Sequence, residues 1–218
     1  MKIRTISLAA LFALSVTASL PAALVISQYA EDGDIKGVEI WNSGPSNITF
    51  NGTDALLEIA NFNNGSASAT FTFSKNSGTI AAGDVLVFAD GSANSIWASS
   101  GITFEEANFS FNGNDALTLS LGGAVVDMFG AVGTDPGSAW SGGGLTTRDQ
   151  NLALLAGITT GDSDGWSDPS ERFEFVAQNP LDSGSGPDLA GFGVAPIPEP
   201  TTTLLGALGL MALLRRRR

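Results

Sequence analysis

Short apolar runs separated by turn residues recur along most of the chain, and this pattern restricts most strongly what the chain can fold into. The runs are rich in β-branched and aromatic side chains, and Gly, Asn and Asp punctuate them. No stretch between the two ends sustains the apolar period of an amphipathic helix. The sequence therefore predicts an all-β domain. The expected strands are residues 24–29, 38–41, 56–60, 69–73, 85–89, 116–121, 124–129, 152–155 and 173–177.

Glycine-containing dipeptides lie between several of these strands. The Asn-Gly pairs at 51–52, 64–65 and 112–113 are suited to turns that need a positive φ. Gly122 and Gly123 predict a tight hairpin between the two strands that flank them. Many short strands joined by regular turns favour a β-sandwich.

The chain contains neither cysteine nor histidine. Without cysteine it is no disulfide scaffold, and its core must hold it together. Without histidine, Ser-His-Asp and Cys-His catalysis and most zinc sites are excluded. We therefore expect a protein that is not an enzyme and that has no cofactor, apart from a calcium alternative described below.

Charge is distributed unevenly along the chain. Of the ten Lys and Arg residues, only four lie between residues 24 and 196, whereas 21 of the 22 acidic residues lie there. This body therefore has a formal net charge of −17. Such a surface repels phosphate backbones, so we expect no nucleic-acid partner.

The first residues have the layout of a secretory signal. Lys2 and Arg4 precede an apolar stretch at residues 6–20, and Val16 with Ala18 has the spacing that signal peptidase requires, with Ala23 as a later candidate. The sequence predicts a signal peptide over residues 1–23. A buried N-terminal helix is the alternative, but the residues that follow already read as a strand.

The last residues form a three-part pattern. Pro198, Glu199 and Pro200 are followed by an apolar stretch at residues 201–214 and by a basic end. The basic residues are Arg215, Arg216, Arg217 and Arg218.

As a helix, the apolar stretch spans about 21 Å, so it crosses a bilayer core of ~30 Å only if it extends backwards and the arginines snorkel. The positive-inside rule keeps the arginines cytoplasmic, which agrees with the signal peptide. A nucleic-acid or targeting patch is the alternative for the arginines.

This end closely resembles the PEP-CTERM sorting signal of Gram-negative bacteria. The resemblance implies recognition by an exosortase-type membrane protease and removal of the tail near residues 198–200. It also implies a transient anchor in the inner membrane, followed by delivery to the outer surface or the exopolysaccharide matrix. The expected partners are thus signal peptidase and exosortase, and then surface proteins or extracellular polysaccharide.

Other segments resemble lamin-tail domains. The opening strand at residues 24–29 and the Glu-Ile-Trp-Asn strand at 39–42 match the start of such domains, and further matches lie at 80–87, 111–117 and 125–130. The loop at residues 135–140 resembles one found in bacterial secreted members of the family. The resemblance covers residues 24–178 and implies an immunoglobulin-like sandwich without shared catalytic residues. The family's Trp-containing segment has no counterpart at residues 50–53.

Asp162, Asp164 and Asp168 alternate within a Gly- and Ser-rich loop. Such carboxylates can wrap a calcium ion, although the spacing of an EF-hand is absent. The other interpretation is a solvated acidic loop.

Two further groups admit both a functional and a structural interpretation. Trp140 and Trp166 stand in expected loops, where they either stack on a sugar or pin the loops by packing. Glu39 and Asn42 either form a ligand site at a sheet end or satisfy loop amides. The adjacent acid pairs at 31–32 and 105–106 do not by themselves make a glycosidase, because neighbouring strand residues point to opposite faces.

We thus expect a signal peptide at 1–23, an immunoglobulin-like sandwich of the lamin-tail type at 24–180, a flexible linker at 181–196 and a sorting signal with one transmembrane helix at 197–218. The expected function is that of an exported, non-enzymatic protein of the cell surface or biofilm matrix. The alternative is a calcium-assisted adhesion or carbohydrate-binding module.

Overall fold

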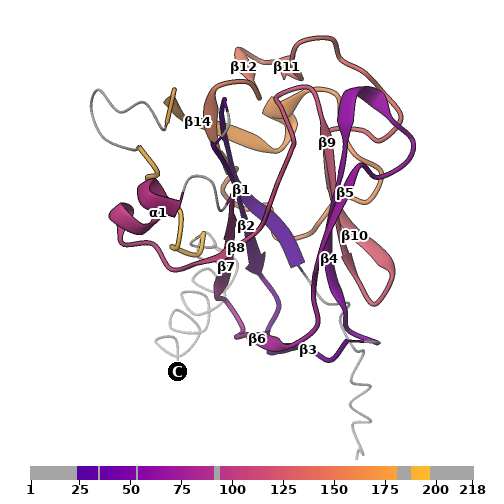
Figure 1. The fold of residues 1–218 in the computed structure, drawn as a ribbon, viewed down its shortest axis with the longest axis vertical. Coiled ribbons are helices and arrows are strands. Elements are labelled where there is room, and N and C mark those ends of the chain that lie inside the picture. Colours follow the sequence, from indigo (N-terminus) through magenta and orange to yellow (C-terminus); the bar gives the residue numbers. More distant parts are fainter. Residues whose placement is uncertain (1–23, 34, 53, 91–93, 181–187, 197–218) are drawn as a thin grey trace, which may run out of the picture.

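The computed structural model describes residues 24–33, 35–52, 54–90, 94–180 and 188–196. These residues form two β-sheets that pack face to face, with one short helix beside them (Figure 1). The prediction of an all-β sandwich is confirmed.

The larger sheet has six strands in the order β14-β13-β1-β2-β7-β8. Its neighbours pair antiparallel except β7 and β8, which are parallel. The strands are β1 (Leu24–Asp32), β2 (Ile35–Asn42), β7 (Val85–Ala89), β8 (Phe104–Glu106), β13 (Gln150–Leu154) and β14 (Phe173–Gln178).

The smaller sheet has four antiparallel strands in the order β10-β9-β4-β5. They are β4 (Leu57–Phe62), β5 (Phe71–Lys75), β9 (Ala116–Leu121) and β10 (Ala124–Phe129). Two short pairs complete the strands: β3 (Ile48–Phe50) with β6 (Gly78–Ile80), and β11 (Ser141–Gly142) with β12 (Leu145–Thr146). The helices are α1 (Asn94–Ser100), η1 (Asn63–Gly65) and η3 (Pro169–Glu171), the last two of the 3-10 type.

Every strand that the sequence predicts overlaps an observed strand. Prediction missed β3, β6, β8, β11 and β12, because two or three residues are too few to show an alternating pattern. It also missed α1, whose seven residues make only about two turns.

The predicted hairpin forms between β9 and β10, where Leu121 pairs with Ala124. Gly122 and Gly123 have φ values of 59° and 81°, the left-handed conformation that such a two-residue turn requires. The Asn-Gly pair at 112–113 is different, because Gly113 has no positive φ. A Cβ on Gly113 would lie 2.6 Å from the Cα of Arg148, so this glycine allows two backbones to approach closely.

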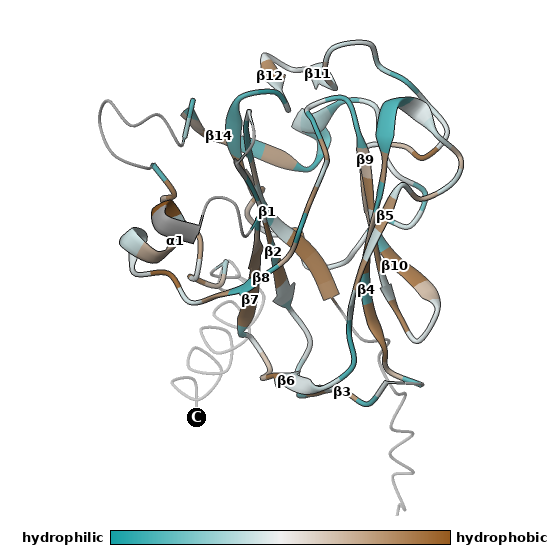
Figure 2. Cartoon of the chain, in the orientation of Figure 1, coloured by the Kyte–Doolittle hydropathy of each residue, from teal (hydrophilic) through white to brown (hydrophobic). Residues whose placement is uncertain are grey.

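The main core is built from buried residues of both sheets. Figure 2 shows hydrophobic residues along the strands of both sheets. Phe129 of β10 is fully buried at the centre of an aromatic cluster. Its ring stacks on Tyr29 with centroids 4.2 Å apart and meets Trp166 edge to face at 4.8 Å. Phe173 of β14 contacts both Phe129 and Trp166. The cluster therefore joins strands of both sheets to the loop that carries Trp166.

A second, smaller core covers the outer face of the six-stranded sheet. Residues 188–196 and α1 lie on the side of this sheet that faces away from the four-stranded sheet (Figure 1). The buried members of this core are Ala30, Val87, Ala89, Trp97, Leu189 and Phe192. The expected flexible linker therefore does not apply to residues 188–196, which pack on the sandwich because they carry two large apolar side chains.

The predicted signal peptide at 1–23 and the predicted transmembrane helix in 197–218 lie outside the described residues. Within the described part of the chain, none of the helices has the length and apolar character needed to cross a membrane. Both segments stay predictions.

The aromatic cluster gives a test of the core. Replacing Phe129 with Ala should lower the free energy of unfolding by about 3–5 kcal/mol, because the removed ring leaves a cavity that rigid neighbours cannot fill. The matched control is Phe175→Ala on β14, since that ring is 51% exposed. The free energy of unfolding of each variant is measured by urea unfolding of the full chain in mild detergent, with tryptophan fluorescence as the signal. Equal losses for the two variants would contradict this description of the core.

Candidate functional site

The sorting residues predicted from the sequence are not among the described residues. Pro198, Glu199, Pro200 and the arginines at 215–218 all belong to the undescribed C-terminal end. Their roles therefore stay predictions, and the described chain ends at residue 196, just before them.

The acidic loop uses its carboxylates to shape its own backbone. Asp162 accepts hydrogen bonds from the N–H groups of Asp164 and Gly165 at 2.9 and 3.2 Å. Asp168 is the N-cap of η3 and accepts from the N–H and the hydroxyl of Ser170 within that helix. Among the described residues, no group of three or more acidic side chains gathers in a way that could hold a metal ion. The structure thus does not bring the three aspartates together, and a calcium site there stays a prediction.

The tryptophans considered for sugar stacking are inside the protein. Trp140 is 1% exposed and Trp166 is 4% exposed. The Trp140 indole N–H donates to the carbonyl of Asp115 at 3.0 Å, and the two indoles meet edge to face. Of the two interpretations, the burial of both rings agrees with packing that pins the loops and not with an exposed sugar platform.

Asn42 has a structural role, because its side chain satisfies backbone groups of neighbouring loops. Its side-chain amide donates to the carbonyls of Ser46, Ile80 and Ala81, and its carbonyl accepts from Gly44 N–H. The side chain is fully buried and ties the end of β2 to neighbouring loops. Glu39 behaves differently, because its carboxylate accepts a hydrogen bond from the N–H of Gly193.

Asp127 is a buried carboxylate that the sequence analysis did not single out. It accepts hydrogen bonds from the N–H groups of Ile26 at 2.7 Å, Asp162 at 2.7 Å and Met128 at 3.0 Å. Arg172 lies 3.4 Å from it. Ile26 belongs to the large sheet and Asp127 to the small one, so this carboxylate links the two sheets. Burial raises its pKa to about 6, against the lowering effect of its N–H donors and of Arg172.

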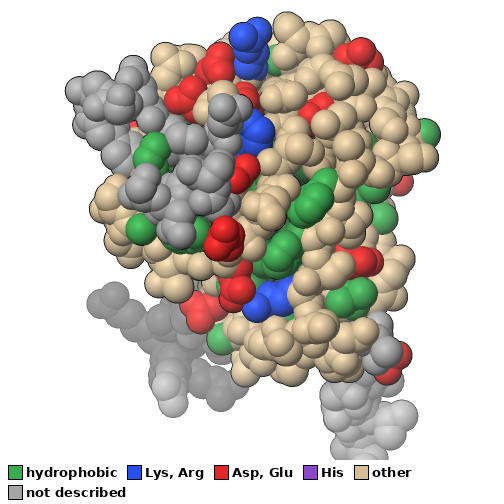
Figure 3. Space-filling model, in the orientation of Figure 1, with side chains coloured by type: hydrophobic (Ala, Val, Ile, Leu, Met, Phe, Trp, Pro, Cys, Tyr) green, Lys and Arg blue, Asp and Glu red, His purple; other side chains and the backbone are tan. Residues whose placement is uncertain are grey.

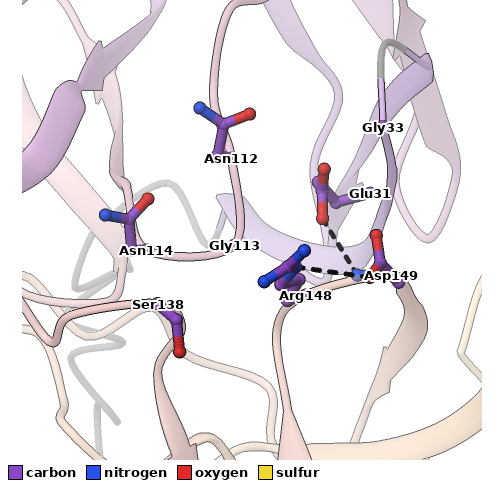
Figure 4. A pocket seen from close by; sticks show the side chains of 8 residues that line it. All are labelled: Glu31, Gly33, Asn112, Gly113, Asn114, Ser138, Arg148 and Asp149. Atoms are coloured by element: carbon purple, nitrogen blue, oxygen red, sulfur yellow. Dashed lines mark hydrogen bonds and ion pairs between the residues drawn. The ribbon is translucent and has the colours of Figure 1, made fainter.

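One pocket of about 310 Å³ opens where several loops meet (Figure 4). This volume is at the lower end of the range for small-molecule sites. The lining residues are Glu31, Gly33, Asn112, Gly113, Asn114, Ser138, Arg148 and Asp149. None of them is aromatic. In Figure 4, Arg148 lies between the two asparagines and the two carboxylates.

The pocket carries charges of both signs. Glu31 accepts from the N–H of Asp149 at 2.9 Å and lies 3.5 Å from the ammonium of buried Lys36. Burial raises the pKa of Glu31, while the Asp149 N–H and Lys36 act to lower it. Arg148 pairs with Asp149 at 3.3 Å, but both side chains are partly exposed, so this pair contributes little to stability. The pocket therefore offers hydrogen-bonding groups of mixed charge rather than a strong field of one sign.

On the face drawn in Figure 3, acidic side chains outnumber basic ones. In each adjacent acid pair of the sequence, one glutamate is paired with a lysine: Glu105 on β8 lies 2.9 Å from Lys75, and Glu31 lies 3.5 Å from Lys36. The described cations thus each face a carboxylate. This surface does not present a basic stripe of the kind that binds nucleic acid.

The comparison with protein families decides what the C-terminal end is. Residues 196–218 match the PEP-CTERM protein-sorting motif. The PEP-CTERM motif implies an exported protein that its C-terminal tail anchors in a membrane and that an exosortase recognises. No curated protein matches the chain, and no solved structure does.

The Asp127 link between the sheets gives a second test. Asp127→Ala should lower the free energy of unfolding at pH 7 by about 3–5 kcal/mol, because Arg172 and three backbone N–H groups lose their acceptor. Asp54→Ala is the matched control, since this carboxylate is exposed and should change stability by less than about 0.5 kcal/mol. Both are measured by urea unfolding. A loss below about 1 kcal/mol for Asp127→Ala would refute the role of this residue.

Proposed function

We propose that this protein is an exported, non-enzymatic component of the outer surface or exopolysaccharide matrix of a Gram-negative bacterium. Signal peptidase removes its first residues, and an exosortase-type protease cuts the chain near residues 198–200. The observation that carries this proposal is the PEP-CTERM motif at residues 196–218.

The arrangement of the chain supports the proposal. The basic end of the tail favours the cytoplasmic side, and the N-terminal signal sends the body to the opposite side. The body is strongly acidic and has no cysteine, so it neither adheres to anionic lipids nor needs an oxidising environment to fold. These are suitable properties for a domain that is delivered away from the membrane.

The absence of histidine and cysteine from the sequence supports a non-enzymatic role. The most buried carboxylates are engaged with backbone N–H groups, which is a structural use. We further propose that the sandwich is an immunoglobulin-like domain of the lamin-tail type. Its two packed, mainly antiparallel sheets and the lamin-tail-like segments at residues 24–42 support this assignment.

The processing part of the proposal predicts both ends of the mature protein. Protein recovered from the outer surface of the native host should begin near residues 19–24 and end near residues 198–200 in intact-mass spectrometry. Pro198→Ala combined with Pro200→Ala should leave the full tail on the protein and keep it in the inner membrane. Surface protein that retains its four arginines would refute processing by an exosortase.

The polar pocket favours a second candidate function, which is binding of a carbohydrate. Sugars are neutral and rich in hydroxyl groups, and they bind to amides, carboxylates and guanidinium groups placed together. Asn112, Asn114, Ser138 and Arg148 supply such groups around one cavity. The absence of an aromatic lining residue favours recognition through hydrogen bonds over stacking. The calcium-assisted form of this function additionally requires the loop with Asp162, Asp164 and Asp168.

A glycan array tests this candidate. The full chain should bind one class of neutral glycan, and Asn112→Ala should weaken that binding at least tenfold. Asn76→Ala is the matched control, because this exposed asparagine lies between β5 and β6 at the other end of the sandwich (Figure 1). Repeating the array with EGTA separates the calcium-assisted form from direct binding. If the chain binds no glycan, with or without calcium, both direct and calcium-assisted carbohydrate binding are refuted.

A further inference from the structure

The segment at residues 188–195, here called the strap, is held on the outer face of the six-stranded sheet by side chains of that sheet. Gln28 of β1 donates to the carbonyl of Ala190 at 2.6 Å and to the side chain of Asn151 at 2.8 Å. Asn151 of β13 donates to the carbonyls of Asp188 and Ala190 at 3.1 and 3.4 Å. Buried amides on two adjacent strands thus recognise the backbone of the strap.

Apolar contacts hold the strap at a second place. Leu189 is 6% exposed and Phe192 is 4% exposed. The Phe192 ring meets the indole of Trp97 on α1 edge to face, with centroids 5.2 Å apart. A Cβ on Gly37 would lie 2.3 Å from this indole, so β2 provides the space in which Trp97 sits. The strap therefore completes a core that the sheet and α1 leave open.

Glu39 provides a third contact. Its carboxylate accepts from the N–H of Gly193 at 2.6 Å and from the hydroxyl of Ser27 at 2.7 Å. The side chain is 1% exposed, and burial raises its pKa to about 7. Ser27 on β1 and Gly193 on the strap act to lower that pKa, and no charged side chain of β1, β7 or the strap contributes to the shift.

The strap ends where the PEP-CTERM motif begins. Ala195 packs against the main core, and the motif match starts at the next residue. Within the strap, the N–H of Phe192 donates to Leu189 and that of Val194 to Gly191, so the backbone follows consecutive turns. A common way to recognise a peptide is to bind it as an extended segment beside a sheet edge. The docked strap, with its consecutive turns, does not offer such an extended segment on the N-terminal side of the motif.

We propose that the strap holds the start of the sorting tail against the folded sandwich, and that the strap must leave the sheet before the tail is cut. This inference rests on the proposed processing by an exosortase. The partner of the outer sheet face is thus a segment of the same chain, and the rate of its release limits processing.

The carboxyl of Glu39 makes strap docking depend on pH. The released strap returns Glu39 to water, where its pKa falls towards 4.5. The docked state therefore binds more protons between pH 4.5 and 7. The resulting stabilisation is fully present below about pH 4.5 and is lost as pH rises through about 7. A shift from 4.5 to about 7 corresponds to a change of about three hundredfold in the docking equilibrium when the whole shift is lost on release.

Hydrogen exchange of the full chain in detergent tests the docking. The Gly193 amide should be protected, and Phe192→Ala should speed its exchange at least tenfold. Val194→Ala is the control, because that side chain is 66% exposed. After correction for intrinsic rates, protection should fall as pH rises from 5 to 8. Glu39→Gln should remove this dependence, and Glu58→Gln, a half-buried glutamate beside Ser74 on β5, should keep it.

A pulse-chase in the native host tests the link to processing. Phe192→Ala should shorten the half-life of the precursor severalfold relative to the unaltered chain and to Val194→Ala. If the unaltered chain is never cut, the proposed function fails, whatever the strap does. If it is cut at the same rate as Phe192→Ala, while exchange shows that this variant has a released strap, the gating by the strap is refuted. An unprotected Gly193 in the unaltered chain refutes the docking itself.

Discussion

The central strands of the six-stranded sheet are buried on both faces, and most of the structure follows from this constraint. Eight of the nine residues of β1 are buried, although a sandwich strand normally alternates between core and solvent. The inner residues face the small sheet, and the outer ones face α1 and the strap. Every polar group on the outer face therefore needs a partner that is not water. Gln28 and Glu39 find theirs in the backbone of the strap.

Buried carboxylates connect the layers in the same way. Asp127 joins the small sheet to β1, Glu31 joins β1 to the turn before β13, and Glu39 joins β2 to the strap. Burial raises the pKa of all three, and in each case backbone N–H groups partly offset the cost. Each of these carboxylates thus fixes two chain segments that are far apart in the sequence. Trp140 and Trp166 also serve the structure, since both lie in loops and are enclosed in the core.

The sequence allowed correct predictions for strands and turns that depend on neighbouring residues. Strands such as β7 and β9 are apolar runs bounded by turn residues, and the Gly122-Gly123 turn follows from the φ values that only glycine adopts readily. Contacts between residues that are far apart in the sequence leave no local pattern from which to predict them. The Asp127 carboxylate reaches Ile26 across 101 positions, and the Glu39 carboxylate reaches Gly193 across 154. The polar pocket is equally non-local, because its residues come from four separate loops and strand ends.

The strap shows why composition alone misjudged one segment. A stretch rich in Gly, Ser and Pro has the composition of a linker, and residues 181–196 fit that description. Two apolar residues within it, Leu189 and Phe192, are enough to dock it, because α1 and the sheet leave an apolar site of matching size. Gly191 permits the contact, since a Cβ there would lie 2.6 Å from the side-chain oxygen of Gln28. The segment directly before the sorting motif is therefore part of the folded body.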